Sequence, residues 1–207
     1  YADDDAQYEE IIEVDVSGFV PMVSLPGKPH NTADVTEVNG QKIDSAFIGS
    51  CTNGRMEDMY AAAEILRNRK IAPGIILKIV PATDLIWKKC LNEGILDVFK
   101  KAGALVSNAG CAGCAAGQVG QNGPGEITIS TGNRNFPGKQ GKGSVYLASP
   151  HIVAASAVAG HITTPDKIPA EPSLFILPEK SEIKPTSGSK QKTDSHKTDV
   201  IEGRIWL

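Results

Sequence analysis

Two hydrophobic periodicities alternate along residues 42–162. Short apolar runs rich in β-branched side chains are typical of buried strands, whereas apolar positions that recur at the spacing of a helical turn are typical of helices. The runs that predict strands are 42–50, 74–83, 104–110, 126–131 and 144–150. The stretches that predict helices are 55–70, 84–103 with an interruption near Gly94 and a stop at Gly103, and 151–162.

Strands that alternate with helices in this way predict an α/β fold, a three-layer α/β/α domain around a mostly parallel sheet. In such sheets, ligands gather beyond the carboxyl ends of the strands. Cys51 and Cys111 each follow the end of a predicted strand. We therefore expect these two residues, which are far apart in the sequence, to converge at one site. Thr52 and Asn53 are expected to cap the helix that follows them.

The segments on either side of this pattern have a different character. Residues 1–40 show little periodicity and are expected to form an extended lead-in, with a short strand over residues 9–18. Residues 178–200 are polar and predict a flexible linker. Residues 201–207 are apolar and predict the first strand of a further domain or, alternatively, an edge strand of this one. One domain is thus expected over residues 1–177, and the missing initiator methionine predicts a fragment or a processed chain.

The composition is that of an ordinary globular domain, with 41% hydrophobic and 22% charged residues. The net charge of -3 gives no reason to expect nucleic acid or a membrane surface as a partner. No apolar run reaches the roughly 18–20 residues that span a bilayer, and the acidic N-terminus does not predict a signal or transit peptide. We therefore expect a cytoplasmic location.

The chain has four cysteines, too few for a disulfide framework at this length, so ligands or buried thiols are expected. Cys111 and Cys114 form a C-x-x-C pair, which suits half a zinc site, a redox pair or a cluster site. No neighbouring residue completes a zinc tetrahedron. A redox pair should open a helix after the first strand of its fold, whereas this pair comes late in the chain and among small residues. With Cys51, three strand-end thiols suit a [4Fe–4S] cluster that leaves one iron open. Cys90 lies within a predicted helix, so a packed or half-exposed thiol is expected there rather than a fourth ligand.

A basic, glycine-rich loop follows the predicted strand at 126–131. It contains Asn133, Arg134, Asn135 and Lys139. Arg can bind a carboxylate through two parallel hydrogen bonds, and Lys adds a compact positive charge. The loop therefore suits a di- or tricarboxylate substrate, with a solvated basic turn as the alternative.

Three sequence blocks resemble the signatures of the aconitase superfamily, which includes aconitase, homoaconitase and the large subunit of isopropylmalate isomerase. The blocks are IGSCTNGR (48–55), GCAGC (110–114) and STGNRNFPGKQG (130–141). They occur in the family's order, and the resemblance covers roughly residues 1–177. It corresponds to the third domain of the large part of these enzymes.

The resemblance implies an α/β/α fold and a [4Fe–4S] cluster held by Cys51, Cys111 and Cys114. It also implies that Asn133 and Arg134 contact the substrate. Lys139 stands where aconitase uses Arg, and a lysine cannot form the bidentate fork, which affects substrate identity or orientation. The GCAGC block and the residues after it form an unusual version of the cluster loop.

The function implied is that of a fragment of an aconitate hydratase-like hydro-lyase, which isomerises a hydroxy di- or tricarboxylic acid by dehydration and rehydration. An isopropylmalate or homoaconitate hydro-lyase domain is the alternative, and a non-enzymatic metal-binding or interaction module is a second one. In the family the catalytic base and its proton partners lie on other domains, so this chain is expected to be inactive alone. Its expected partners are the remaining upstream domains and a downstream swivelling domain, in a fused chain. The cluster is expected to be lost when the isolated domain is prepared in air.

Overall fold

The computed structural model describes residues 2–169, so the predictions for residues 178–200 and 201–207 lie outside the described residues. The elements in chain order are β1 (Met22–Ser24), β2 (Thr32–Asp34), the 3₁₀ helix η1 (Val35–Val38), β3 (Ser45–Gly49), α1 (Ser50–Asn53), α2 (Met56–Leu66), β4 (Ile76–Val80), α3 (Asp84–Asn92), α4 (Ile95–Ala102), β5 (Leu105–Val106), η2 (Ala112–Cys114), β6 (Ile127–Ser130), β7 (Ser144–Leu147), α5 (Pro150–Ala159) and η3 (Pro165–Lys167). The predicted strands and helices between residues 42 and 162 are all present, including the break near Gly94 and the stop at Gly103.

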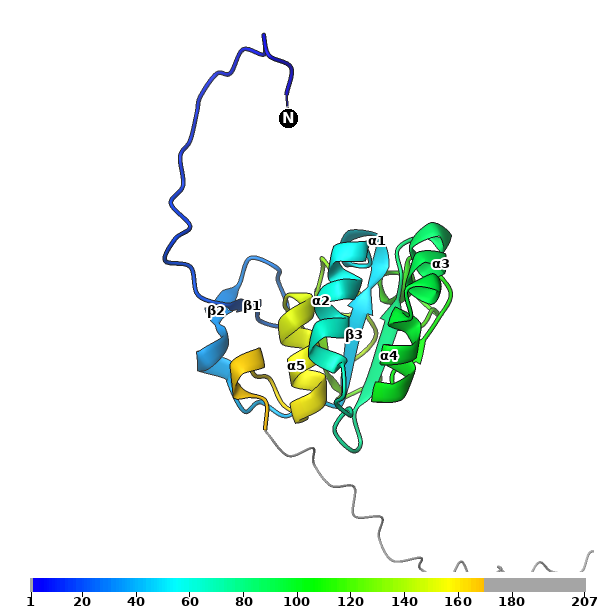
Figure 1. The fold of residues 1–207 in the computed structure, drawn as a ribbon. Coiled ribbons are helices and arrows are strands. Elements are labelled where there is room, and N and C mark those ends of the chain that lie inside the picture. Colours follow the sequence, from blue (N-terminus) through cyan, green and yellow to red (C-terminus); the bar gives the residue numbers. More distant parts are fainter. Residues whose placement is uncertain (1, 170–207) are drawn as a thin grey trace, which may run out of the picture. The chain divides into compact units, whose positions relative to one another are not determined.

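The strands form one seven-stranded sheet in the order β2-β1-β7-β6-β3-β4-β5. The neighbours from β7 to β5 are parallel, and β1 pairs antiparallel with both β2 and β7. β3 is the middle one of the five parallel strands and pairs with β4 along its whole length, from Ser45 opposite Ile76 to Gly49 opposite Val80. The predicted α/β class with a mostly parallel sheet is therefore confirmed (Figure 1).

The helices α2, α4 and α5 pack together on one face of the sheet (Figure 1). α5 is buried from Ile152 to Val158, and its alanines and Ser156 allow it to approach β3 and α2 closely. Large apolar side chains fill the space between strands and helices on this face. The largest of these that are fully buried are Ile48, Met59, Leu66, Leu77, Ile79, Phe99 and Ile129.

The other face of the sheet combines buried hydroxyl groups with apolar side chains such as Phe47 and Val80. Ser45 and Thr128 join β3 to β6 through hydroxyl groups 2.9 Å apart, and Ser130 is buried beside them. We call the segments that cover this face, residues 107–126 and 131–143, the loop layer. The loop layer supplies Asn122, whose side chain donates to the Thr128 hydroxyl at 3.1 Å.

The loop layer differs from the expected three-layer arrangement. Within residues 2–169 it contains no helix besides the three-residue η2. A physical reason lies in the buried hydroxyl groups on the face beneath it, because they need hydrogen-bond partners that the apolar stripe of a helix does not provide. The expected second helical layer is thus replaced by irregular chain that supplies polar side chains.

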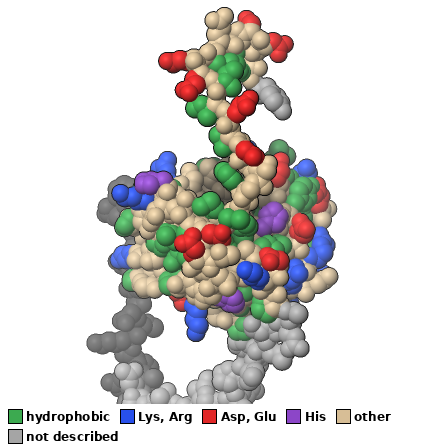
Figure 2. Space-filling view, turned by 90° about the vertical axis from the view of Figure 1, so that its left-hand side faces the viewer, with side chains coloured by type: hydrophobic (Ala, Val, Ile, Leu, Met, Phe, Trp, Pro, Cys, Tyr) green, Lys and Arg blue, Asp and Glu red, His purple; other side chains and the backbone are tan. Residues whose placement is uncertain are grey.

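The first forty residues contain more structure than the expected lead-in. β1 and β2 form a short antiparallel pair that extends the sheet beyond β7, and the Asp34 carboxylate caps η1. The strand expected over residues 9–18 is wrong, because these residues form no strand. Hydrophobic side chains are exposed along this segment (Figure 2), namely those of Ile11, Ile12, Val14 and Val16. Among the described residues, no helix has the length and apolar character needed to cross a membrane.

A substitution of Gly120 tests the contact between the loop layer and Phe47 in the sheet. This glycine has φ +106, and a Cβ there would lie 2.8 Å from the Phe47 ring and 2.9 Å from the Gly113 nitrogen. Gly120→Ala is therefore expected to lower the free energy of unfolding by roughly 2–4 kcal/mol, through backbone strain and overpacking together. In the control Gly117→Ala, where φ is +76 and no atom lies within 4 Å, only the strain of about 1–2 kcal/mol is expected. Equal losses in urea unfolding would contradict the contact.

Candidate functional site

Cys51 lies in a tight turn directly after the central strand β3. Gly49 precedes the turn, and a Cβ on this residue would lie 2.0 Å from the Val80 carbonyl oxygen, so only glycine fits against β4 here. Ser50 then has φ +72, a left-handed conformation that is unfavourable for a residue with a side chain. The turn leaves Cys51 exposed at the carboxyl end of the sheet.

Cys111 and Cys114 lie in the loop layer, at the two ends of a single 3₁₀ turn. Cys111 is exposed and Cys114 is half-buried. Ala112, between them, has φ +52. Besides glycines, only Ser50, Asn68 and Ala112 have positive φ within residues 2–169, so two of the three strained positions adjoin predicted ligands. Strained backbone of this kind persists where the surrounding structure holds it, and it is common at functional sites.

Both cysteine turns are tied to the residues that follow β4. The Ala82 N–H donates to the Gly54 carbonyl at 2.8 Å, and the Gly110 N–H donates to the Pro81 carbonyl at 3.3 Å. α1 and η2 are also in contact. The structure thus brings the turn of Cys51 and the loop of Cys111 together, as the topology of a parallel sheet predicts.

The electrostatics of Cys111 show which groups surround it. Desolvation is the largest cause that raises the pKa of the Cys111 thiol, and the neighbouring Cys114 and Cys51 sulfurs raise this pKa further. The positive charge of Lys139 acts in the opposite direction. Charges perturb a thiol in this way only at short range. Cys51, Cys114 and the ammonium group of Lys139 are therefore all near enough to the Cys111 thiol to influence its charge.

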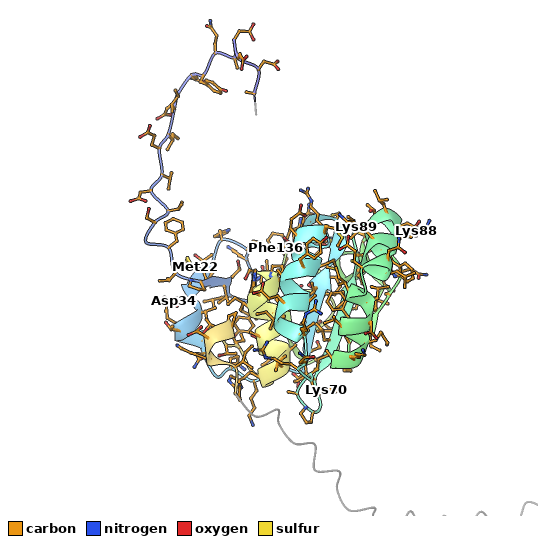
Figure 3. The ribbon with its side chains drawn as sticks, in the orientation of Figure 1. Met22, Asp34, Lys70, Lys88, Lys89 and Phe136 are labelled. Atoms are coloured by element: carbon orange, nitrogen blue, oxygen red, sulfur yellow. The ribbon has the colours of Figure 1, made fainter. Side chains whose placement is uncertain are left out.

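The basic loop after β6 lies beside Cys114. A small pocket is lined by Ser50, Cys114, Asn133, Arg134 and Lys139, so it combines residues from all three sequence blocks. Asn133 and Arg134 are exposed and Lys139 is half-buried. Phe136, in this loop, lies at the end of the sheet where α1 lies, and Lys70 lies at the opposite end (Figure 3).

The fourth polar residue of the basic loop, Asn135, has a structural role. It is buried, and its side-chain amide donates to the Leu25 carbonyl at 2.7 Å and to the Val145 carbonyl at 3.1 Å. These hydrogen bonds tie the residues after β1 to β7. Asn135 thus fixes the base of the loop, while Asn133 and Arg134 face the pocket.

The expectation that Thr52 and Asn53 cap the helix α2 is wrong. The Asp58 carboxylate accepts the Arg55 N–H at 3.0 Å and closes this helix end instead. The Asn53 side chain donates to the Thr131 carbonyl. Asn53 therefore joins the turn of Cys51 to the start of the basic loop.

Cys90 is separate from the other cysteines. It is buried in α3, with its sulfur 3.9 Å from that of Met56 in α2. Burial is the main cause that raises the pKa of the Cys90 thiol to about 11. The structure therefore confirms the prediction of a packed thiol.

Sequence reasoning missed two residues that line the pocket, Ser50 and Gln140. Gln140 is buried, where it accepts from the Ser130 hydroxyl at 2.9 Å and donates to the Gly120 carbonyl at 3.1 Å. Its position beside Lys139 in the third sequence block was the available signal. Ser50 had no signal apart from its place before Cys51.

The donor groups are of the type that holds an iron–sulfur cluster. Within residues 2–169, no set of three His, Cys, Asp or Glu side chains is grouped so that it could hold a metal ion. Thiolates around a [4Fe–4S] cluster bind different irons, so they are spread more widely than the ligands of one ion. Three thiols on two turns, with the cation of Lys139 near them, are compatible with such a group.

The exposure of the four thiols predicts an order of reactivity. We expect an alkylating reagent at neutral pH to modify Cys51 and Cys111 first, Cys114 more slowly, and Cys90 only when the protein unfolds. The reactive form is the thiolate, and a buried thiol whose pKa is raised to about 11 forms little of it. Mass spectrometry of the metal-free protein measures the order. Modification of folded Cys90 as fast as Cys51 would be inconsistent with this packing.

Comparison with known proteins places the chain in a family. A profile of the Aconitase family (aconitate hydratase) matches residues 33–160, more than half of the chain. The homoaconitase large subunit of Thermus thermophilus is 44% identical over 173 residues, which cover 83% of this chain and 41% of that protein. A probable 3-isopropylmalate dehydratase large subunit of Methanothermobacter thermautotrophicus is 46% identical over 168 residues, 80% of this chain and 40% of that protein. The chain spans about two fifths of the length of these relatives. It belongs to the aconitase family.

Proposed function

We propose that this chain is the part of an iron–sulfur hydro-lyase that holds a [4Fe–4S] cluster and one side of the substrate site. The observation that carries the proposal is the pocket that places Cys114 beside Asn133, Arg134 and Lys139. A purely structural cluster has no need of exposed cationic and amide side chains next to its ligands. A carboxylate substrate that binds at the cluster does need them.

The three cysteines and the cationic residues of the pocket have roles that follow from their chemistry. Cys51, Cys111 and Cys114 would bind three irons of the cluster, and the open fourth iron would supply a Lewis acid for the substrate's hydroxyl and carboxylate groups. Arg134 can pair with a further carboxylate through two hydrogen bonds. Lys139 adds a positive charge without that fixed geometry.

The substrate class that the cationic and amide side chains of this pocket favour is a hydroxy di- or tricarboxylic acid. The relatives named as homoaconitase and 3-isopropylmalate dehydratase large subunits support an acid of this class, and the reaction would be dehydration followed by rehydration. The polar side chains that line the pocket are thiol, amide, hydroxyl and cationic groups, and no carboxylate or imidazole is among them. We therefore assign proton removal to another part of the protein, and we expect the chain to be inactive alone.

The partner that completes the site is a swivelling domain, either in the same chain or in a separate subunit. The relatives are named as large subunits, which supports the separate arrangement. The fused arrangement was predicted from residues 178–207, which lie outside the described residues, and it stays a prediction. Either partner would have to face the pocket lined by Arg134 and Lys139.

Anaerobic reconstitution with iron and sulfide tests the cluster. We expect the chain to take up roughly four irons and to gain visible iron–sulfur absorbance. Serine at position 51, 111 or 114 should prevent stable assembly, because each change removes one thiolate ligand. The matched control is Cys90→Ser, which should leave iron uptake unchanged because Cys90 lies in the core. A chain that binds zinc but no cluster would support the non-enzymatic alternative and overturn the proposal.

Arg134→Gln tests the substrate clamp. In the reconstituted protein, we expect it to weaken binding of a tricarboxylate by about ten- to a hundredfold, as the loss of a charged hydrogen bond implies. Arg67→Gln is the control, since Arg67 is exposed at the far end of α2. A titration followed by the visible spectrum of the cluster gives both affinities. Equal affinities for the two variants would remove Arg134 from the site.

A further inference from the structure

Two glutamine side chains hold the backbone between Cys111 and Cys114. The Gln118 Oε1 atom accepts the Ala112 N–H at 3.1 Å. The Gln121 Nε2 atom donates to the Gly113 carbonyl at 2.5 Å. One glutamine therefore binds the peptide group that follows Cys111, and the other binds the peptide group that precedes Cys114.

The turn between the cysteines needs support from outside. Ala112 has φ +52, a left-handed conformation that costs about 1–2 kcal/mol in a residue other than glycine. Within the turn, the Cys114 N–H donates to the Cys111 carbonyl at a long 3.4 Å. Gly113 packs closely against neighbours below, since a Cβ there would lie 3.0 Å from both Gln140 Nε2 and the Gly120 carbonyl oxygen. This packing fixes how closely the turn approaches Gln140 and Gly120. The hydrogen bonds of the two glutamines fix the orientation of its peptide groups.

Gln121 is itself anchored to the sheet. The Lys78 ammonium group, on β4, donates to the Gln121 carbonyl at 2.9 Å. The next residue, Asn122, is buried and bonds to Thr128 on β6. Hydrogen bonds to β4 and β6 thus hold the backbone at Gln121 and Asn122, and the Gln121 side chain in turn orients the turn between the cysteines. Gln118, in contrast, is exposed and acts through its single hydrogen bond to Ala112.

We propose that Gln118 and Gln121 are positioning residues that direct the thiols of Cys111 and Cys114 toward their shared ligand. The inference rests on the proposed function for the identity of that ligand, but the backbone conformation belongs to the metal-free chain. The two glutamines act in opposite senses, since Gln118 is an acceptor and Gln121 is a donor. The same substitution, Gln to Glu, should therefore be tolerated at position 118 and damaging at position 121.

The experiment compares Gln118→Glu, Gln118→Leu, Gln121→Glu and Gln121→Leu in the full 207-residue chain. Val119→Glu is the charge control, because Val119 lies in the same segment and is exposed. Amide hydrogen exchange at Ala112 and Cys114 reports the turn in the metal-free chain. The rate at which the reconstituted cluster is lost in air reports the consequence for the ligand.

Leucine at either position should increase amide exchange in the turn by about fivefold, as the loss of one hydrogen bond implies, and should speed cluster loss. Gln118→Glu should behave like the unchanged chain, because a carboxylate oxygen still accepts the Ala112 N–H. Gln121→Glu should behave like the leucine variant, because a carboxylate cannot donate to the Gly113 carbonyl. Val119→Glu should change neither readout.

A suppressor variant separates positioning from bulk packing. Glycine adopts positive φ without a steric penalty, so Ala112→Gly should restore cluster retention in the Gln118→Leu background. A packing role for the Gln118 side chain would not be rescued in this way.

Three outcomes would overturn the inference: Glu and Leu equally harmful at position 118, Gln121→Glu as stable as the unchanged chain, or Val119→Glu as harmful as Gln121→Glu. Failure of the proposed function is distinguishable from these outcomes. The unchanged chain would then take up no iron, while the exchange rates at Ala112 and Cys114 would still decide whether the glutamines hold the turn.

Discussion

The buried hydroxyl groups on one face of the sheet determine how the site is built. Ser45, Thr128 and Ser130 lie where water does not reach, so their polar atoms need partners within the protein. An irregular segment can supply them, because its Asn and Gln side chains are not restricted to the spacing of one helical face. Asn122 and Gln140 meet this need. The segment that carries Cys111 and Cys114 is placed by the same hydrogen bonds that satisfy the sheet.

A second constraint acts at the carboxyl ends of the strands. The two residues after β4, Pro81 and Ala82, bond to both cysteine turns, so neither turn can move without disturbing the other. This shared anchor explains how Ser50 and Ala112 keep a left-handed backbone. Local strain of this kind is stable only where several contacts over-determine the conformation.

Hydrophobic periodicity predicted well the face of the sheet that the helices cover. The reason is that apolar positions, such as Met59 in α2 and Ile79 in β4, recur at regular intervals along these elements. It could not reveal β1 and β2, whose three residues each are too few to define a period.

The convergence of Cys51 with Cys111 followed from topology alone, since both residues follow strand ends of one parallel sheet. The hydrogen bond from Asn53 to Thr131 and the one from Ala112 to the Gln118 side chain did not follow from the topology. A contact between one side chain and a distant backbone atom leaves no repeating trace in a sequence.

The two faces of the sheet obey different rules of substitution. Next to α5, what matters is volume, and any side chain of the right size and shape preserves the packing. Beneath the loop layer, the number and direction of donors and acceptors matter in addition to volume, because the hydrogen bonds of the Gln140 side chain have no apolar substitute. Substitutions in the loop layer can therefore change which ligand this fold binds. The helices on the other face, which provide most of the hydrophobic stability, can stay the same.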